Sequence, residues 1–152
     1  MSESSLPGSD ADDEGRVELS APATPEMMHM VHAVLEQLWS QHEDVSMVDR
    51  IRFETAVIEI LGNIVEHAYE MEAGDSERRF DVRLTATDSA LVASFGDDGM
   101  PNTIDLSDIV MPDEEAESGR GLALAMAAVD ELSYDRSAGR NHWRLTCLRQ
   151  PG

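Results

Sequence analysis

The chain has 152 residues, enough to bury the core of one domain without a structural metal or a disulfide. Its formal net charge is −20 at pH 7, and every basic residue is an arginine. An acidic surface repels phosphate backbones and anionic lipids, so we expect neither nucleic acid nor a membrane as a partner. The single cysteine, Cys147, excludes an internal disulfide.

Residues 1–15 are mostly serine, glycine, aspartate and glutamate, a composition that buries too little apolar surface to order itself. We expect these residues to form a disordered acidic tail, and residues 16–152 to form one domain. The tail has neither the basic nor the apolar segment of a secretory signal. No apolar run approaches the roughly 20 residues of a membrane helix, so we expect a soluble, cytoplasmic protein.

A short strand is predicted at residues 16–21, and a helix follows it. Thr24 suits the N-cap of this helix, and Pro25 suits its first position, where a backbone N–H is not needed. Apolar residues then recur at helical spacing, at Met27, Met28, Val31, Val34, Leu35 and Leu38.

A second helix is predicted over residues 47–69. Residues 44–46 break the first helix, and Ser46 and Asp49 have the spacing of a capping box. The apolar residues of the second helix can pack on a sheet, and they include Val57, Ile60, Leu61 and Ile64.

Three polar residues of different chemistry, Glu59, Asn63 and His67, lie at four-residue spacing within this helix and therefore share one face. A carboxylate and an amide side by side could orient a nucleophile and hold a hydrated Mg²⁺, which prefers oxygen ligands and keeps several waters. An amphipathic helix with these residues on its solvent side gives the same spacing. The stretch alone leaves both interpretations open.

The second half of the chain alternates as strands do. Residues 78–88 and 89–99 predict a hairpin that turns at Asp88 and Ser89, and residues 97–118 predict a long loop with one helical turn near 104–109. Four elements complete the chain: a helix at 121–132, a strand at 133–137, a turn at 138–141 and a strand at 142–149. This order predicts an α+β two-layer sandwich, with helices on one face of a mostly antiparallel sheet.

Two further stretches are typical of nucleotide sites. In "FGDDGMP", at residues 95–101, Asp97 could accept a hydrogen bond from the amine of adenine, and glycines allow a close approach. In "ESGRGLALAM", at 117–126, Gly119 and Gly121 open a helix whose N-terminal N–H groups suit phosphates. An ordinary β-turn and a closely packed helix start, respectively, would produce the same letters.

Together these stretches resemble the GHKL superfamily of ATPases and kinases, which has the Bergerat ATP-binding fold. The strings "EILGNIVEHAYE", "GDDGMP" and "GRGLALAMAAVDELSY" are most similar to the small anti-sigma-factor serine/threonine kinases of the RsbW and SpoIIAB type. The resemblance covers residues 16–149. It implies ATP and Mg²⁺ as ligands.

The resemblance also implies a role for each matching residue. Asn63 would coordinate Mg²⁺, Glu59 would act as the general base, and Asp97 would accept the adenine amine. Gly99 would leave room for the base. His67 matches the pattern among the nucleotide-binding residues without a chemical step of its own.

The lid and the phosphate site are implied in the same way. Residues 102–118 would form an ATP lid, and the residues that embrace the phosphates would be Gly119, Arg120, Gly121 and Leu122. The sequence departs from the family near the adenine, where a Gly-Thr-Thr is usual and this chain reads "GRNHW". Asn141 or His142 would therefore replace a hydroxyl contact.

The function implied by the resemblance is an anti-sigma factor that binds a sigma factor and phosphorylates an antagonist of the STAS type on serine or threonine. A homodimer is implied as well. One alternative is a non-catalytic module that switches partners with nucleotide occupancy, and another is an ATPase fragment allied to histidine kinases. The retained Glu59 and Asn63 favour the kinase over the first alternative. The short lid and the lack of phosphoacceptor helices argue against the second.

Overall fold

The computed structural model describes residues 16–70, 79–98 and 125–150, and for residues 67–70 the backbone alone. The predicted tail and lid, Gly99 and the glycines that open the later helix lie outside these ranges. The described elements are β1 (Arg16–Pro22), η1 (Pro25–Met27), α2 (Met28–Gln41), α3 (Met47–Glu70), β2 (Arg79–Ala86), β3 (Ala90–Asp97), β4 (Glu131–Ser137) and β5 (Arg140–Leu148).

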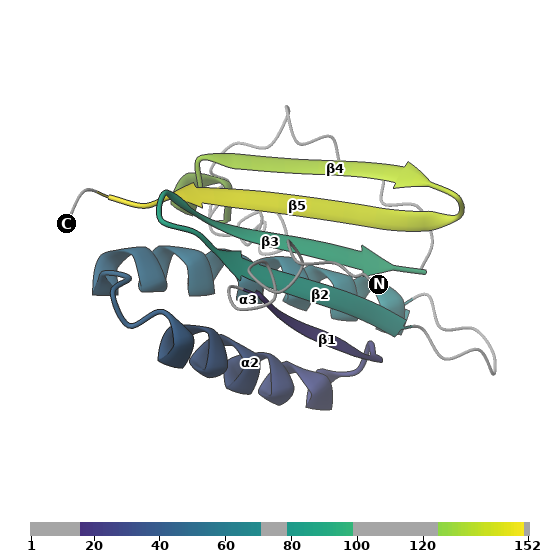
Figure 1. The fold of residues 1–152 in the computed structure, drawn as a ribbon. Coiled ribbons are helices and arrows are strands. Elements are labelled where there is room, and N and C mark those ends of the chain that lie inside the picture. The colour runs from purple at the N-terminus through teal and green to yellow at the C-terminus, as the bar shows by residue number, and fades with distance from the viewer. Residues whose placement is uncertain (1–15, 71–78, 99–124, 151–152) are drawn as a thin grey trace, which may run out of the picture.

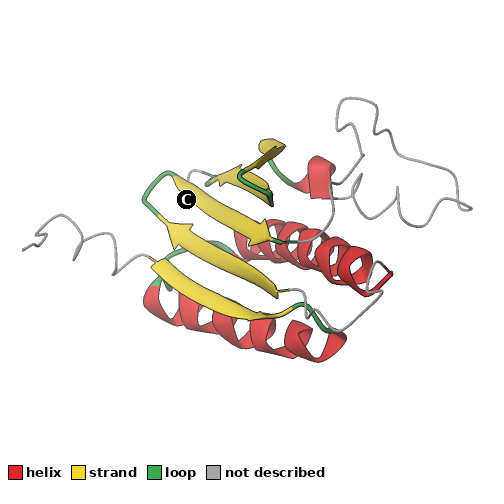
Figure 2. Ribbon diagram, turned by 90° about the vertical axis from the view of Figure 1, so that its right-hand side faces the viewer, coloured by secondary structure: helices red, strands yellow, loops and turns green. Residues whose placement is uncertain are grey.

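The strands form one sheet in the order β1-β2-β3-β5-β4, and each neighbouring pair is antiparallel. Two helices cover one face of this sheet (Figures 1 and 2). Helix α2 packs against β1 and β2, while α3 packs against β3 and β5. The predicted α+β two-layer sandwich is therefore confirmed, and the described sheet is antiparallel throughout.

Alternation along the strands builds the core. The inward-facing positions of β2, β3 and β5 are buried and mostly apolar, while their outward neighbours are more exposed and mostly polar. This is the pattern of an antiparallel sheet with one covered face. The largest fully buried side chains come from both layers, and they include Phe53, Phe80, Phe95, Leu35, Leu38, Ile60, Leu61 and Leu145. Among the described residues, no helix is both long and apolar enough to span a bilayer.

The start of the first helix differs from the prediction. Pro25 occupies the first position of a 3-10 turn, and the α-helix itself begins at Met28. Thr24 is extended, and its side chain makes no capping hydrogen bond there. The backbone carbonyl of Thr24 instead accepts from Met27 N–H at 3.0 Å, which closes the turn. Thr24 is therefore the N-cap and Pro25 the first residue, as predicted, but of a 3-10 turn, and Thr24 caps it through its backbone and not through its side chain.

The start of α3 confirms half of the predicted capping box. Ser46 Oγ accepts a hydrogen bond from the backbone N–H of Asp49 at 3.1 Å. The carboxylate of Asp49, which would return to Ser46 in a full box, is instead buried and accepts from Arg52 Nη1 at 3.1 Å and from Gln150 N at 2.9 Å. Asp49 thus joins the helix start to the end of the chain.

The helix predicted at 121–132 ends earlier than predicted. Residues 125–128 are helical, residues 129 and 130 bend, and β4 already begins at Glu131. The reason is a long-range hydrogen bond: Asp130 N donates to Thr146 O at 2.9 Å, so the chain pairs with β5 from this point on.

The turn between β4 and β5 is also shorter than predicted. Ala138 and Gly139 alone form it, with φ of 53° and 76°. Two left-handed residues are what a type I′ hairpin requires.

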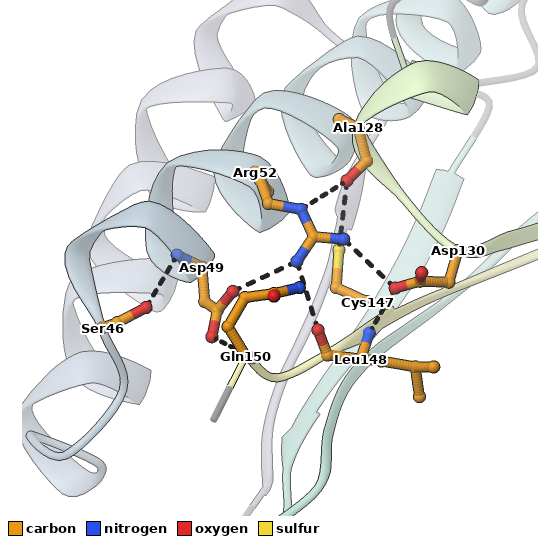
Figure 3. Close-up of polar contacts among 8 residues, drawn as sticks. All are labelled: Ser46, Asp49, Arg52, Ala128, Asp130, Cys147, Leu148 and Gln150. Atoms are coloured by element: carbon orange, nitrogen blue, oxygen red, sulfur yellow. Dashed lines mark hydrogen bonds and ion pairs between the residues drawn. The ribbon is translucent and has the colours of Figure 1, made fainter. Parts of the chain in front are cut away.

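Arg52 connects α3 to three other segments (Figure 3). Its Nε donates to Ala128 O, its Nη1 to Asp49 Oδ1 and Leu148 O, and its Nη2 to Asp130 Oδ2, each at 3.1 Å. Burial lowers the pKa of Arg52, but the hydrogen bonds that it donates to Asp130 and Asp49, with the nearby negative charge, outweigh this effect and raise the pKa. The guanidinium therefore stays charged and fixes α3 against the end of β5.

We predict that Arg52→Met lowers the free energy of unfolding by about 2–4 kcal/mol, because the buried carboxylate of Asp49 and the carbonyls of Ala128 and Leu148 each lose a donor. Urea denaturation measures this change. The matched control is Arg83→Met, which removes an exposed arginine whose ion pair with Glu18 is 3.6 Å long. The control is expected to lose less than about 1 kcal/mol. Equal losses in both variants would contradict the anchoring role of Arg52.

A second prediction concerns pH. The backbone N–H of Leu148, and then Arg52, hold the pKa of Asp130 below its ordinary value of 3.8. A carboxylate with a lowered folded-state pKa stabilises the protein above its unfolded pKa, and this contribution is lost as the pH falls through the folded pKa. Asp130→Asn is therefore expected to be less stable than the wild type at pH 7, with a difference that shrinks below about pH 4. A difference that stays constant from pH 7 to 3 in urea titrations would show that the charge of Asp130 is unimportant.

Candidate functional site

The polar flank of α3 carries the first two predicted site residues. Glu59 lies seven residues after Arg52 and Asn63 lies four after Glu59, so the three share one side of the helix. Both Glu59 and Asn63 are half-buried, as expected of a partly covered site. The apolar residues around them are buried, which confirms the predicted packing of Val57, Ile60, Leu61 and Ile64.

The anchor at Arg52 determines which end of the sheet this flank approaches. Arg52 binds Leu148, and Leu148 pairs with Ala90 at the start of β3. Asn63 lies eleven positions after Arg52, about 16 Å along a helix. Strand β3 has eight residues, Ala90–Asp97, and its ends are about 23 Å apart. The later half of α3 and the end of β3 therefore lie toward the same end of the molecule (Figure 1).

Asn63 has an incomplete set of hydrogen bonds. Its Nδ2 atom is buried and has no partner among the described residues. A buried amide left in this state costs about 1–3 kcal/mol unless a ligand or another group satisfies it. An Asn side chain also offers an oxygen, the ligand type that Mg²⁺ prefers. The residue therefore fits a ligand-binding position better than a structural one.

Asp97 belongs to a buried network at the end of β3. It pairs with Asn141 across the β3–β5 ladder, and its Oδ1 accepts from Asn141 Nδ2 at 2.9 Å. Asn141 Oδ1 in turn accepts from the Tyr134 hydroxyl and from Arg136 Nη1. Because Arg136 can only donate, it requires the oxygen of the amide and fixes its orientation so that the nitrogen faces Asp97. The carboxylate is thus held in place by an amide with one orientation.

This network shows which residue, Asn141 or His142, can replace the hydroxyl contact that the family has near the adenine. Buried positions alternate along β5, and Asn141 is one of them, on the side that faces the helices. His142 pairs with Gly96 and points to the opposite face of the sheet. Asn141 is therefore the residue that contacts Asp97.

The sequence reasoning missed Tyr134 and Arg136. Their signal was the alternation along β4, which puts them on the same side as Leu132, but the strand alone does not reveal its partner. Gly96 was also missed as a constrained position. A Cβ there would lie 2.9 Å from Arg140 Nη2 and 3.0 Å from Asp81 Oδ1, because that ion pair crosses directly over the glycine.

The phosphate-binding residues predicted at Gly119, Arg120, Gly121 and Leu122 lie outside the described residues, as do Gly99 and the side chain of His67. Their roles stay predictions. The helix that follows the glycines is described from Ala125, which is fully buried. Its last carbonyl, Ala128 O, accepts from Arg52 on the flank that also carries Glu59. The described part of this helix therefore ends beside the candidate site's own helix.

Comparisons with known proteins agree with the fold. Residues 21–147 match the family described as Histidine kinase-like ATPase domain. One similar solved structure contains the RsbU and RsbW domains of Rv1364c from Mycobacterium tuberculosis, with 23% identity and a TM-score of 0.62 over 90% of this chain and 33% of that one. Another, the SiaB–SiaC complex from Pseudomonas aeruginosa, has 15% identity and a TM-score of 0.64 over 92% and 94%. A comparison with curated proteins found no match.

We predict that Asn141→Leu destabilises the protein by about 2–4 kcal/mol, since Asp97 loses a buried donor and Tyr134 and Arg136 lose their acceptor. Urea denaturation provides the measurement. Asn141→Thr restores a hydroxyl that both donates and accepts, so it should recover part of the loss. If the leucine variant were as stable as the wild type, the network would be only a passive contact.

Proposed function

The chain belongs to the family of histidine kinase-like ATPase domains, and on this premise we propose that it is an ATP-dependent serine/threonine protein kinase that acts as an anti-sigma factor. The observation that carries the proposal is the arrangement at one end of the fold. A helix flank with a half-buried carboxylate and an incompletely bonded amide lies toward the same end of the molecule as the strand end where Asp97 is held by Asn141 (Figure 1).

Asp97 and Asn141 form the adenine side of the proposed site. An ionised carboxylate accepts hydrogen bonds and donates none, so it suits the exocyclic amine of adenine and disfavours the carbonyl oxygen that guanine has at the same place. Asn141 keeps this carboxylate in one orientation. ATP would therefore be preferred over GTP because the wrong base leaves a buried acceptor facing another acceptor.

Asn63 and Glu59 form the reactive side. The amide of Asn63 would hold Mg²⁺, which neutralises the charge of the phosphates when it is bound. Glu59 would accept the proton from a serine or threonine hydroxyl of the protein substrate, or from water in slow hydrolysis. Gly119, Arg120, Gly121 and Leu122 would surround the phosphates, with residues 102–118 as a lid. His67 would support the helix beside that lid.

The partners follow from the family resemblance and from the named neighbours. An RsbW domain has this fold, and the SiaB–SiaC structure is a complex of two proteins. We propose that this chain binds a sigma factor, phosphorylates a STAS-type antagonist and forms a homodimer. Phosphorylation of the antagonist would then determine whether this chain binds the antagonist or the sigma factor, and so control transcription.

The experiment is transfer of label from [γ-³²P]ATP to purified STAS-domain proteins of the same organism, with Mg²⁺ present. Glu59→Gln is expected to bind ATP as the wild type does and to lose label transfer by about 100-fold or more, since a positioned general base contributes about 10²–10⁴ in rate. The labelled residue should be serine or threonine after acid hydrolysis.

The matched control is Glu66→Gln, an exposed glutamate one heptad along the same helix. It should transfer label at the wild-type rate. Transfer by Glu59→Gln at that rate would show that Glu59 is not the base. Nucleotide binding without transfer by the wild type to any antagonist would favour the non-catalytic switching module.

A further inference from the structure

A groove is lined by residues of α2, of α3 and of the segment that connects them. Of the α2 residues that line it, His32, Glu36 and Ser40 are exposed, whereas Trp39 is buried and forms the floor. Its volume is about 620 Å³, and its lining residues are His32, Glu36, Trp39, Ser40, Glu43, Met47, Arg50 and Glu54. Glu59 and Asn63 are not among them, so the groove is separate from the candidate nucleotide site.

The floor of the groove is rigid. Trp39 Nε1 donates to Glu54 Oε2 at 2.7 Å, and the indole meets the Phe53 ring edge-on, with centroids 5.9 Å apart. The guanidinium of Arg50 lies 5.5 Å from the centre of the Trp39 ring. An aromatic side chain fixed in this way loses little conformational entropy on binding, which is a property of interaction hot spots.

The charge of the groove is negative at its rim. Glu36 and Glu43 are exposed there, and Glu54 is half-exposed. Arg50 is the one arginine in the lining, and its Nε and Nη2 groups donate to the carbonyls of Val45 and Glu43. Three carboxylates against one guanidinium leave the groove negative, a surface suited to lysine or arginine.

Apolar side chains continue the groove along α3. Met47, Val48 and Ile51 are 65%, 62% and 57% exposed, and three large apolar residues this exposed within five positions are unusual on a helix that is otherwise well packed. Because 47 and 51 are four residues apart, they form a stripe beside the acidic rim. The surface thus combines an aromatic floor, an apolar edge and carboxylates.

Charge repulsion disfavours binding of this chain's own acidic segments, or of a second copy of the chain, in the groove. Residues 1–15 contain five acidic and no basic residues, and residues 99–124 contain six acidic residues and one arginine. A second copy would bring the same acidic rim against this one in a two-fold contact. Each of these would be repelled, whereas a basic segment would be attracted.

We propose that this groove binds an amphipathic, basic helix of a partner protein. His32 and Ser40 both line the groove from α2 and are eight residues apart, about 12 Å, so a helix of at least two turns fits. Its aliphatic residues would lie on Trp39, Met47 and Ile51, with lysine or arginine beside Glu36 and Glu43. The inference goes beyond the proposed kinase activity, because it needs neither ATP nor Glu59.

The probe is a synthetic peptide of about 15 residues with leucine on one helical face and arginine on its borders, and its binding is followed at low salt by the fluorescence anisotropy of a dye on the peptide. Glu36→Gln with Glu43→Gln is expected to weaken binding at least tenfold. The control, Glu26→Gln with Glu131→Gln, changes the net charge equally at exposed sites outside the groove and should change binding less than about twofold. A peptide with glutamate in place of arginine should not bind.

The apolar edge is tested separately. Met47→Ser with Ile51→Ser should weaken the peptide at least tenfold, whereas Leu148→Ser, at another exposed apolar position, should not. Equal losses in groove and control variants, or no binding to the wild type, would overturn the proposal. Sedimentation velocity adds one more outcome. If the wild type is a dimer and the double variant Met47→Ser with Ile51→Ser is a monomer, this face binds a second copy of the chain, and the proposal is overturned as well.

Discussion

The four hydrogen bonds of Arg52 set the position of α3 relative to the sheet. They connect the first turns of the helix to the end of β5, to Asp130 at the start of β4, and to the last carbonyl of the helix that follows the predicted phosphate-binding glycines. Helix α3 carries Glu59 and Asn63 on the same flank. A shift of this helix by one residue would rotate that flank by about 100° and move both residues away from the site.

The other half of the site depends on a strand register. Asp97 meets Asn141 because β3 and β5 pair with these two residues opposite each other, and Tyr134 and Arg136 reach Asn141 from β4. A one-residue slip in either ladder would turn these side chains to the opposite face. The site is therefore assembled by the same pairings that close the core, which explains why a buried polar network can be kept at the end of an apolar sheet.

Local patterns predicted much of this fold. The period of the apolar residues located both helices, and alternation located the hairpin of β2 and β3, since each signal depends on neighbours in sequence. The errors came from distant contacts. The helix predicted to reach residue 132 gives way to a strand because Asp130 pairs with Thr146, and the roles of Tyr134 and Arg136 depend on a partner several residues along another strand. The residues of the site were predicted from motifs, whereas the choice of Asn141 over His142 required the register.

The central claim is that the flank of α3 and the end of β3 form one nucleotide site. Its most direct test is titration calorimetry of ATP and ADP, with and without Mg²⁺, on the wild type and on Asn63→Ala. The account predicts that the wild type binds ATP more tightly with Mg²⁺ than without it. It also predicts that Mg²⁺ does not increase the affinity of Asn63→Ala for ATP. No binding of either nucleotide to the wild type would contradict it, and the fold would then serve protein partners alone.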